Sequence, residues 1–331
     1  MTETKTNTEE LAVPSNRTLK SVGGINTQFA VALLLMVIIV APWVAYPIFV
    51  MKVMCFGLFA AAFNLLIGQV GLLSFGHAAF FGGASYVTAY TLKTWDLTPE
   101  LAVLTGTAFA GLSGLVMGWV AIRRQGIYFA MVTLAIAQMF YFFCVQFSAT
   151  GGENGIQAVP RGNAFSLIDL TQPAALYAFV SSVFVIGLAI IWRVVNSPFG
   201  ATLAAIRDNE DRAISLGYRT SRYKLGAFVI SAALAGLAGA TKAVVFQVAA
   251  LTDVAWHMSG EVILMTLVGG IGTFFGPVVG ALVIVALQNY IAGYAIPISV
   301  VTGTIFVACV LVFRRGIIGE MLYRIGNNRK N

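Results

Sequence analysis

The sequence predicts an all-α polytopic membrane protein with about ten transmembrane or broken helices. Of its 331 residues, 59% are hydrophobic and only 10% are charged, and the mean hydropathy is +0.87. A soluble domain carries about 25% charged residues, so this chain lacks the charge that water-exposed surfaces require. The 34 glycines fit the same class, because closely packed transmembrane helices use small residues where they touch.

Ten apolar segments are candidate spans, since a helix that crosses the bilayer needs about 20 mostly apolar residues. They are approximately 28–48, 50–69, 72–92, 100–122, 127–147, 174–195, 224–248, 258–275, 277–293 and 297–314. Gly272, Gly276 and Pro277 interrupt the eighth and ninth segments. These two segments are therefore expected to be either broken helices or a re-entrant pair.

Polar segments delimit this transmembrane domain, which we assign to residues 28–317. Residues 1–27 are polar, show no cleavable signal sequence and are expected to form a flexible tail, and residues 318–331 form a second tail. A polar loop at 196–223 separates the sixth span from the seventh. It is too short to be a domain, yet it is charged and rich in helix-forming residues.

The basic residues predict which side of the membrane each loop faces. With ten spans and the N-terminus inside, 16 of the 20 lysines and arginines lie on the inner side, against Lys93 and Arg161 outside. Cytoplasmic loops collect basic residues, so both termini and the 196–223 loop are expected in the cytoplasm. The outer loop at 148–173 either meets a partner or is merely solvated. Lys242 is expected near the outer interface, where its side chain can reach water.

Sequence patterns for catalysis and cofactor binding are missing from the chain. It has no G-x-x-x-x-G-K-[ST] loop for nucleotide phosphates, no H-E-x-x-H and no G-x-S-x-G. Its two histidines, His77 and His257, have no partners at metal-ligand spacing. We therefore expect no catalytic residue, no metal and no cofactor bound by this chain. The net charge of +7 is attributed to membrane topology rather than to nucleic-acid binding.

Two glycine-rich segments, 64–86 and 261–283, contain polar residues within apolar runs. Glycine-interrupted helices free backbone groups and often line transport pathways, although glycines also serve close helix packing. Glu261 either has a gating role or simply opens its helix. Each segment is the second span of a four-span group, at 50–148 and 224–314, which suggests a weak internal repeat. The candidate pathway residues are Asn64, Gln69, Ser74, His77, Gln138, Gln247, Glu261, Gly269, Gly270 and Gly272.

The polar loop is predicted to contain one or two short helices. Pro198 suits the first turn of a helix, Asp208 is expected to cap the next one, and Gly217 is expected to end it. Such a surface helix either lies on the membrane or inserts into a groove of a partner protein. The acidic residues among the basic ones weaken binding to anionic lipid and favour the partner.

Four segments together resemble the LivM-type permease subunit of branched-chain amino acid ABC importers. They are residues 64–86, 206–240, 261–280 and 314–320, and the resemblance runs from about 30 to 320. It implies a second, LivH-type permease, two ATPase subunits of the LivG and LivF types that bind ATP and Mg, and a periplasmic substrate-binding protein. It also implies that the loop at 196–223 couples to the ATPases. The implied coupling residues are Arg207, Asp208, Asn209, Glu210, Ala213 and Gly217, with Leu216 beside them on the apolar face.

The sequence therefore predicts a non-catalytic permease in the bacterial inner membrane. It would form half of the translocation pathway for branched-chain or other hydrophobic amino acids. A permease of the same family for urea, or for aromatic or other organic acids, remains an alternative, because the shared motifs do not specify the substrate. A facilitative channel that acts alone is the second alternative, and flux without any ATPase would distinguish it.

Overall fold

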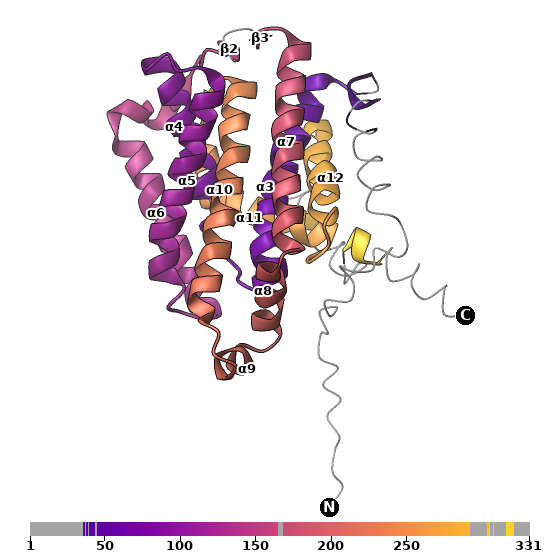
Figure 1. The fold of residues 1–331 in the computed structure, drawn as a ribbon. Coiled ribbons are helices and arrows are strands. Elements are labelled where there is room, and N and C mark those ends of the chain that lie inside the picture. Colours follow the sequence, from indigo (N-terminus) through magenta and orange to yellow (C-terminus); the bar gives the residue numbers. More distant parts are fainter. Residues whose placement is uncertain are drawn as a thin grey trace, which may run out of the picture.

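The computed structural model describes residues 36, 38, 40–43, 45–164, 168–291, 303, 304, 307 and 316–320. The predicted spans at 28–48 and 297–314 and both predicted tails fall largely outside these residues, so the cytoplasmic placement of the termini stays a prediction. The described residues form a bundle of long, roughly aligned helices with connections at its two ends (Figure 1).

Five described helices are long and apolar enough to cross a membrane. They are α3 (Pro47–Val70), α5 (Pro99–Ala121), α6 (Ile127–Gln146), α7 (Pro173–Val195) and α10 (Thr220–Phe246). Each matches a predicted span to within about four residues at either end. The multi-pass membrane class is thus confirmed, whereas the expected number of ten is not reached among the described residues.

Three further helices are shorter than the sequence predicts. The span expected at 72–92 begins only at His77, as α4 (His77–Thr94), because Gly71 adopts a φ of +77° and residues 71–76 are not helical. The span expected at 258–275 ends at Gly269, as α11 (Trp256–Gly269), and α12 (Gly276–Ile291) follows after a loop at 270–275. These helices of 14 and 16 residues are about 21 and 24 Å long, less than the hydrocarbon thickness of about 30 Å.

The core of the bundle lies where α3, α4, α5 and α10 meet (Figure 1). The aromatic rings of Phe59, Phe63, Phe80, Phe81 and Phe228 are almost completely buried there. The helices α10 and α4 approach so closely that a Cβ on Gly239 would overlap the carbonyl oxygen of Phe81. The helices α5, α6 and α7 expose large apolar side chains instead, as expected of a surface that faces lipid.

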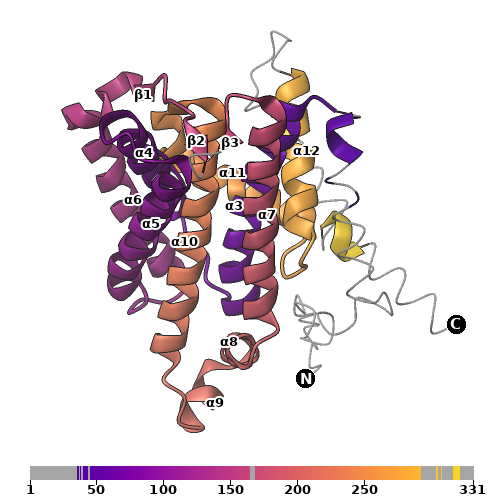
Figure 2. The same cartoon turned by 45° about the horizontal axis from the view of Figure 1, so that its top comes forward.

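Two small sheets and three 3-10 turns gather at one end of the bundle, which we call the strand end (Figure 2). The antiparallel strand β1 (Ile156–Gln157) pairs with β4 (Val248–Ala249), and β2 (Asn163–Ala164) pairs with β3 (Ile168–Asp169). The 3-10 turns are η1 (Ser148–Thr150), η2 (Gly152–Asn154) and η3 (Leu251–Asp253). The topology predicted from the sequence assigns these segments to the outer side of the membrane.

The polar loop occupies the opposite end, which we call the α9 end (Figure 1). Its two helices are α8 (Pro198–Asp208) and α9 (Glu210–Ser215). The polar loop is shorter than predicted at its C-terminal boundary, because α10 already begins at Thr220. The basic residues predicted that successive loops alternate between the two sides of the membrane. The observed loops alternate between these two ends in the same order.

The expectation that the Lys242 side chain reaches water at the interface is wrong. Lys242 is only 8% exposed, and its Nζ lies 2.5 Å from Oδ2 of Asp253, which is 3% exposed. The turn η3 folds back over the end of α10 and places this carboxylate beside the ammonium group. The lysine is therefore neutralised inside the protein rather than by solvent.

Candidate coupling and translocation site

The α8–α9 segment is a pair of helices that share a single elbow residue. Ser197 Oγ accepts a hydrogen bond from the Gly200 amide at 3.3 Å, and Pro198 occupies the first turn of α8. Asn209 ends α8 and begins α9, and its Oδ1 accepts from the Arg212 amide at 2.9 Å. The cap is thus Asn209 rather than the predicted Asp208. Gly217, with a φ of +89°, ends the segment as predicted.

Two charged side chains attach this segment to the bundle. The guanidinium group of Arg207 donates a hydrogen bond to the carbonyl oxygen of Gly68, near the end of α3. Glu210 Oε1 lies 2.6 Å from Nζ of Lys224 in the first turns of α10. Its other oxygen, Oε2, accepts from Gln125 Nε2 at 3.2 Å, in the loop between α5 and α6. The α8–α9 segment is therefore held at three places.

The opposite side of the segment is apolar and exposed. The side chains of Ile214, Leu216 and Tyr218 are 53%, 72% and 45% exposed. Beside them lies a groove of about 300 Å³. The lining residues of the groove are Ala201, Thr202, Ala205, Asn209, Arg212, Ala213, Leu216 and Tyr218. Of the seven predicted coupling residues, Arg207 and Glu210 face the bundle, and Asn209, Ala213 and Leu216 line the groove. Asp208 is exposed and pairs with Arg207 at 3.2 Å, and Gly217 ends the segment.

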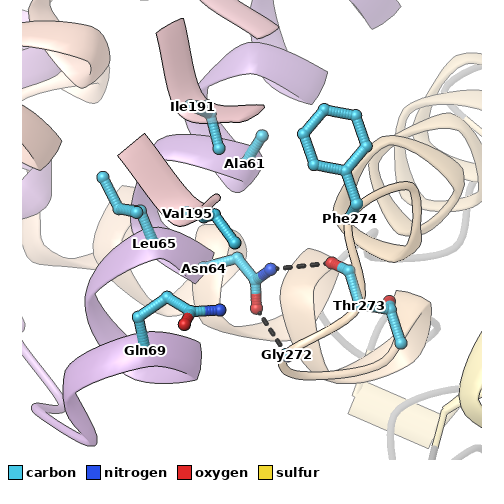
Figure 3. A pocket seen from close by; sticks show the side chains of 9 residues that line it. All are labelled: Ala61, Asn64, Leu65, Gln69, Ile191, Val195, Gly272, Thr273 and Phe274. Atoms are coloured by element: carbon cyan, nitrogen blue, oxygen red, sulfur yellow. Dashed lines mark hydrogen bonds between the residues drawn. The ribbon is translucent and has the colours of Figure 1, made fainter. Parts of the chain in front are cut away.

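A second feature lies where α3 and α7 meet the loop at 270–275 (Figure 3). Asn64 Nδ2 donates to the Thr273 carbonyl at 2.8 Å, and Asn64 Oδ1 accepts from the Gly272 amide at 2.9 Å. A cavity of about 20 Å³, room for about one water molecule, adjoins this contact. It is lined by Ala61, Asn64, Leu65, Gln69, Ile191, Val195, Gly272, Thr273 and Phe274. The structure thus brings three predicted pathway residues together: Asn64, Gln69 and Gly272.

The coupling segment and this cavity are connected through α3. Gly68 lies one helical turn after Asn64, and its carbonyl oxygen accepts the hydrogen bond from Arg207. A Cβ on Gly68 would stand 3.0 Å from both Oδ1 of Asn64 and Cα of Gly272. Arg207, Gly68, Asn64 and the 270–275 loop therefore form one continuous line of contacts.

The predicted interruption of the 64–86 segment is a non-helical stretch, residues 71–76, between α3 and α4. Side chains satisfy its freed backbone groups, as the absence of water in the hydrocarbon region requires. Thr133 Oγ1 accepts from the Phe75 amide at 3.1 Å, and Ser74 Oγ accepts from the Gly76 amide at the same distance. Ser259 Oγ donates to the Phe75 carbonyl at 2.7 Å and accepts from the Ala78 amide at 3.0 Å.

His77 is buried among aromatic rings at the start of α4. Its Nε2 lies 2.9 Å from Ser231 Oγ, and that hydroxyl donates its proton to the Ala62 carbonyl at 2.6 Å. Ser231 Oγ must therefore accept from His77, so the ring carries a proton on Nε2. Edge contacts with Phe63 and other phenylalanines surround the ring, and Nδ1 has no hydrogen-bond partner in the described part of the chain. A pathway role for Ser74 and His77 stays a prediction.

The other predicted pathway residues lie apart from the cavity or beside its loop. Gln247 Nε2 donates to the Val159 carbonyl at 3.1 Å and thereby attaches the end of α10 to the strand end. Glu261 is half-buried on α11. Gln138 is half-buried on α6. Gly269 and Gly270 end α11 and lead into the loop that Asn64 holds.

Sequence reasoning missed the partners that make these residues a site. Thr273 and Lys224 contact Asn64 and Glu210 across 209 and 14 positions of the chain. The sequence offered one indication of these partners: Lys224 follows the acidic residues of the polar loop, 14 positions after Glu210. In the described residues no three His, Cys, Asp or Glu side chains are grouped so as to hold a metal ion.

Comparisons with known proteins agree with the resemblance seen in the sequence. The family described as branched-chain amino acid transport system / permease component matches residues 46–314. The high-affinity branched-chain amino acid transport system permease proteins LivM of Escherichia coli K12 and Salmonella typhimurium LT2 are each 27% identical to the chain, over 68% of its length. The alignment spans 59% of the length of both relatives.

A more distant relative has a similar description. The probable branched-chain amino acid transport permease protein LivM of Methanocaldococcus jannaschii is 24% identical, over 75% of this chain and 77% of its own. No solved structure matches the chain significantly.

Proposed function

The chain belongs to the family of branched-chain amino acid transport permeases, and from this premise we propose that it is one of the two permeases of an ATP-binding cassette importer. It would form half of the translocation pathway for branched-chain or other hydrophobic amino acids across the bacterial inner membrane. A homologous permease would supply the other half. Two ATPase subunits would bind ATP and Mg, and a periplasmic protein would deliver the substrate.

The observation that carries this proposal is the two-sided α8–α9 segment. One side is attached to three different parts of the bundle through Arg207 and Glu210. The other side offers Ile214, Leu216 and Tyr218 beside an open groove. Charged side chains of this segment bind the bundle, and its exposed side is apolar. Such a segment can pass movement from a docked protein to the membrane helices. Because the chain has no phosphate-binding loop of its own, we propose an ATPase as that protein.

The route of transmission follows the line of contacts from Arg207 to the 270–275 loop. A displacement of α8 would pull on the Gly68 carbonyl and hence on the end of α3. Asn64, one turn earlier in α3, would carry the displacement to the loop through its bonds to Gly272 and Thr273. Two packed arrangements of these elements, rather than a gradual deformation, would correspond to the two states of the transporter.

The small size of the cavity at this contact supports the proposal that the pathway is closed in the described conformation. Pockets that enclose small molecules have volumes of about 300 to 1,000 Å³. The cavity beside Asn64 measures only about 20 Å³, so a leucine-sized molecule does not fit there. Passage would require the 270–275 loop or α7 to move away from α3, and ATP-driven movement of α8 would supply this step.

Purification of the complete transporter through a tag on this chain tests the proposal. We expect two ATPase subunits and a second permease to co-purify, and the complex to accumulate leucine in liposomes only when ATP and the binding protein are supplied. The variant L216D should lower ATPase recovery and uptake together, while the exposed strand-end variant E153Q should leave both unchanged. Substrate flux through the purified chain without any ATPase would instead establish a channel. ATP-driven uptake of urea or an organic acid but not of leucine would reassign the substrate.

A further inference from the structure

The turn between α5 and α6 carries two arginines without acidic partners. Arg123 and Arg124 follow closely after the end of α5, and both are exposed. Among the described residues, neither arginine makes an ion pair. The carboxylate of Glu210 reaches this turn, but it contacts Gln125 and Lys224 instead. The turn therefore keeps two positive charges that no acid in the described part of the chain neutralises.

An exposed apolar stripe along α5 leads to Arg123. Its members recur every three or four positions and therefore lie on one face of the helix. They are Leu101, Leu104, Ala108, Leu112, Leu115 and Trp119. The stripe is about 27 Å long, close to the hydrocarbon thickness of about 30 Å. Arg123 follows Trp119 by four positions, and its guanidinium carbon lies 4.5 Å from the centroid of the indole ring. The guanidinium group is thus held where a lipid-facing surface ends.

Aromatic side chains place this turn at the level of the lipid headgroups. Trp119 lies two residues before the end of α5, and Tyr128 is the second residue of α6. They are 61% and 67% exposed, and such residues gather at the boundary between hydrocarbon and water. The turn lies at the α9 end, where Gln125 contacts Glu210 (Figure 2). This end is predicted to be cytoplasmic, and the cytoplasmic leaflet carries anionic lipids.

We infer that the α5–α6 turn binds an anionic phospholipid, with Arg123 and Arg124 contacting its phosphate group and the α5 stripe contacting its acyl chains. The inference goes beyond the proposed function and depends only on the membrane class of the chain. Guanidinium groups present paired donors that match phosphate oxygens. An acidic protein surface would match the two charges, but it would not match a stripe that continues through the hydrocarbon region.

Lipid binding to the purified full chain in detergent tests the site. The probe is fluorescent phosphatidylglycerol, which is anionic, displaced by unlabelled phosphatidylglycerol or by zwitterionic phosphatidylcholine. The unaltered chain should bind phosphatidylglycerol at least about tenfold more tightly at low salt, because each arginine near a headgroup contributes about fivefold. R123Q and R124Q should each lower this preference by about fivefold, and R123Q/R124Q should abolish it. R123K keeps the charge and should keep most of the preference.

A third arginine at the same end supplies the matched control. Arg222 is also exposed, but no residue of α10 after it, from 223 to 246, is exposed, so no lipid-facing stripe leads to it. R222Q should therefore retain the preference for phosphatidylglycerol. An equal loss in R222Q and R123Q would mean that net charge alone attracts the lipid, and it would overturn the inference.

Three further outcomes would contradict the site. The unaltered chain could bind both lipids equally, or R123Q/R124Q could keep the lipid preference. If that double variant kept the preference and lost the ATPase subunits on co-purification, the turn would contact protein instead. A measurement on the unaltered chain keeps the test readable if a variant fails to fold. Salt at about 1 M should remove most of the preference, because it screens exposed charges, and a preference that salt leaves unchanged is the third contrary result.

Discussion

Glu210 Oε1 lies 2.6 Å from Nζ of Lys224, and this ion pair joins the short helix α9 to the base of the long helix α10. The lysine side chain is 9% exposed and the glutamate side chain 25%. The second carboxylate oxygen of Glu210 contacts Gln125. Although Glu210 belongs to a segment that we propose as a docking element, its carboxylate faces the bundle and positions that segment.

Reversing the charge of Glu210 is therefore expected to affect the permease itself. E210K would place two cations together at a mostly buried position, and we expect a destabilisation of about 1 to 2 kcal/mol, visible as a lower thermal unfolding temperature. The double variant E210K/K224E should recover most of that loss. D211K, which reverses the charge of an exposed neighbouring side chain, should lower the unfolding temperature much less. Equal unfolding temperatures for E210K and D211K would contradict this role of Glu210.

The hydrogen bond from Arg207 to Gly68 gives a second prediction, on coupling rather than on stability. R207A removes the connection between α8 and α3 but leaves the outward face of α9 intact. We expect the ATPase subunits still to co-purify, while ATP-driven uptake falls by about tenfold or more, because one charge-assisted hydrogen bond is lost. R222A, at an exposed position of α10, is the matched control and should transport normally. Loss of ATPase recovery in R207A would assign the residue to docking instead.

Two glycines of α11 offer a third prediction with an internal control. A Cβ on Gly269 would overlap the carbonyl oxygen of Gly276, whereas a Cβ on Gly260 would meet no atom within 4 Å. G269A should therefore force α11 and α12 apart and cost about 1 to 3 kcal/mol or more. G260A should be neutral or stabilise the helix by about 0.5 to 1 kcal/mol. Thermal unfolding of the two purified variants measures the difference, and equal unfolding temperatures would refute the close contact.

The buried pair of Lys242 and Asp253 gives a fourth prediction. D253N leaves an ammonium group buried without a counter-charge, and we expect a loss of about 3 to 5 kcal/mol. K242M/D253N removes both charges, so it should recover a large part of this loss. The measurement is the yield of folded, monodisperse protein together with its unfolding temperature. If D253N were as stable as the unaltered chain, the pair would have to be open to water.

The sequence was most informative about long, uniformly apolar helices. For α3, α5, α6, α7 and α10, hydropathy over about 20 residues predicted the observed bounds closely. The family resemblance also identified the α8–α9 segment, because its charges and its helix-ending Gly217 are local features. The coupling role of its residues stays a prediction.

The start of the predicted span at 72–92 was wrong for a reason that hydropathy cannot register, since α4 begins at His77. Residues 71–76 are as apolar and as glycine-rich as a packed helix, and no charge marks the break. Their non-helical conformation depends on hydroxyl groups of Thr133 and Ser259, which are 58 and 184 positions away from Phe75 in the chain. Backbone groups that leave a helix inside a membrane need such partners, and only the packed bundle supplies them.

The sequence by itself determined the membrane class, the alternation of the loops between two ends and the existence of a charged, helix-prone segment at one of them. Composition, periodicity and local caps act over a few residues and suffice for these properties. The tertiary structure alone decided which charges are paired: Glu210 with Lys224, and Lys242 with Asp253. Electrostatic energy depends on distances of a few ångströms between side chains, and residues distant in sequence reach such distances only when the helices pack.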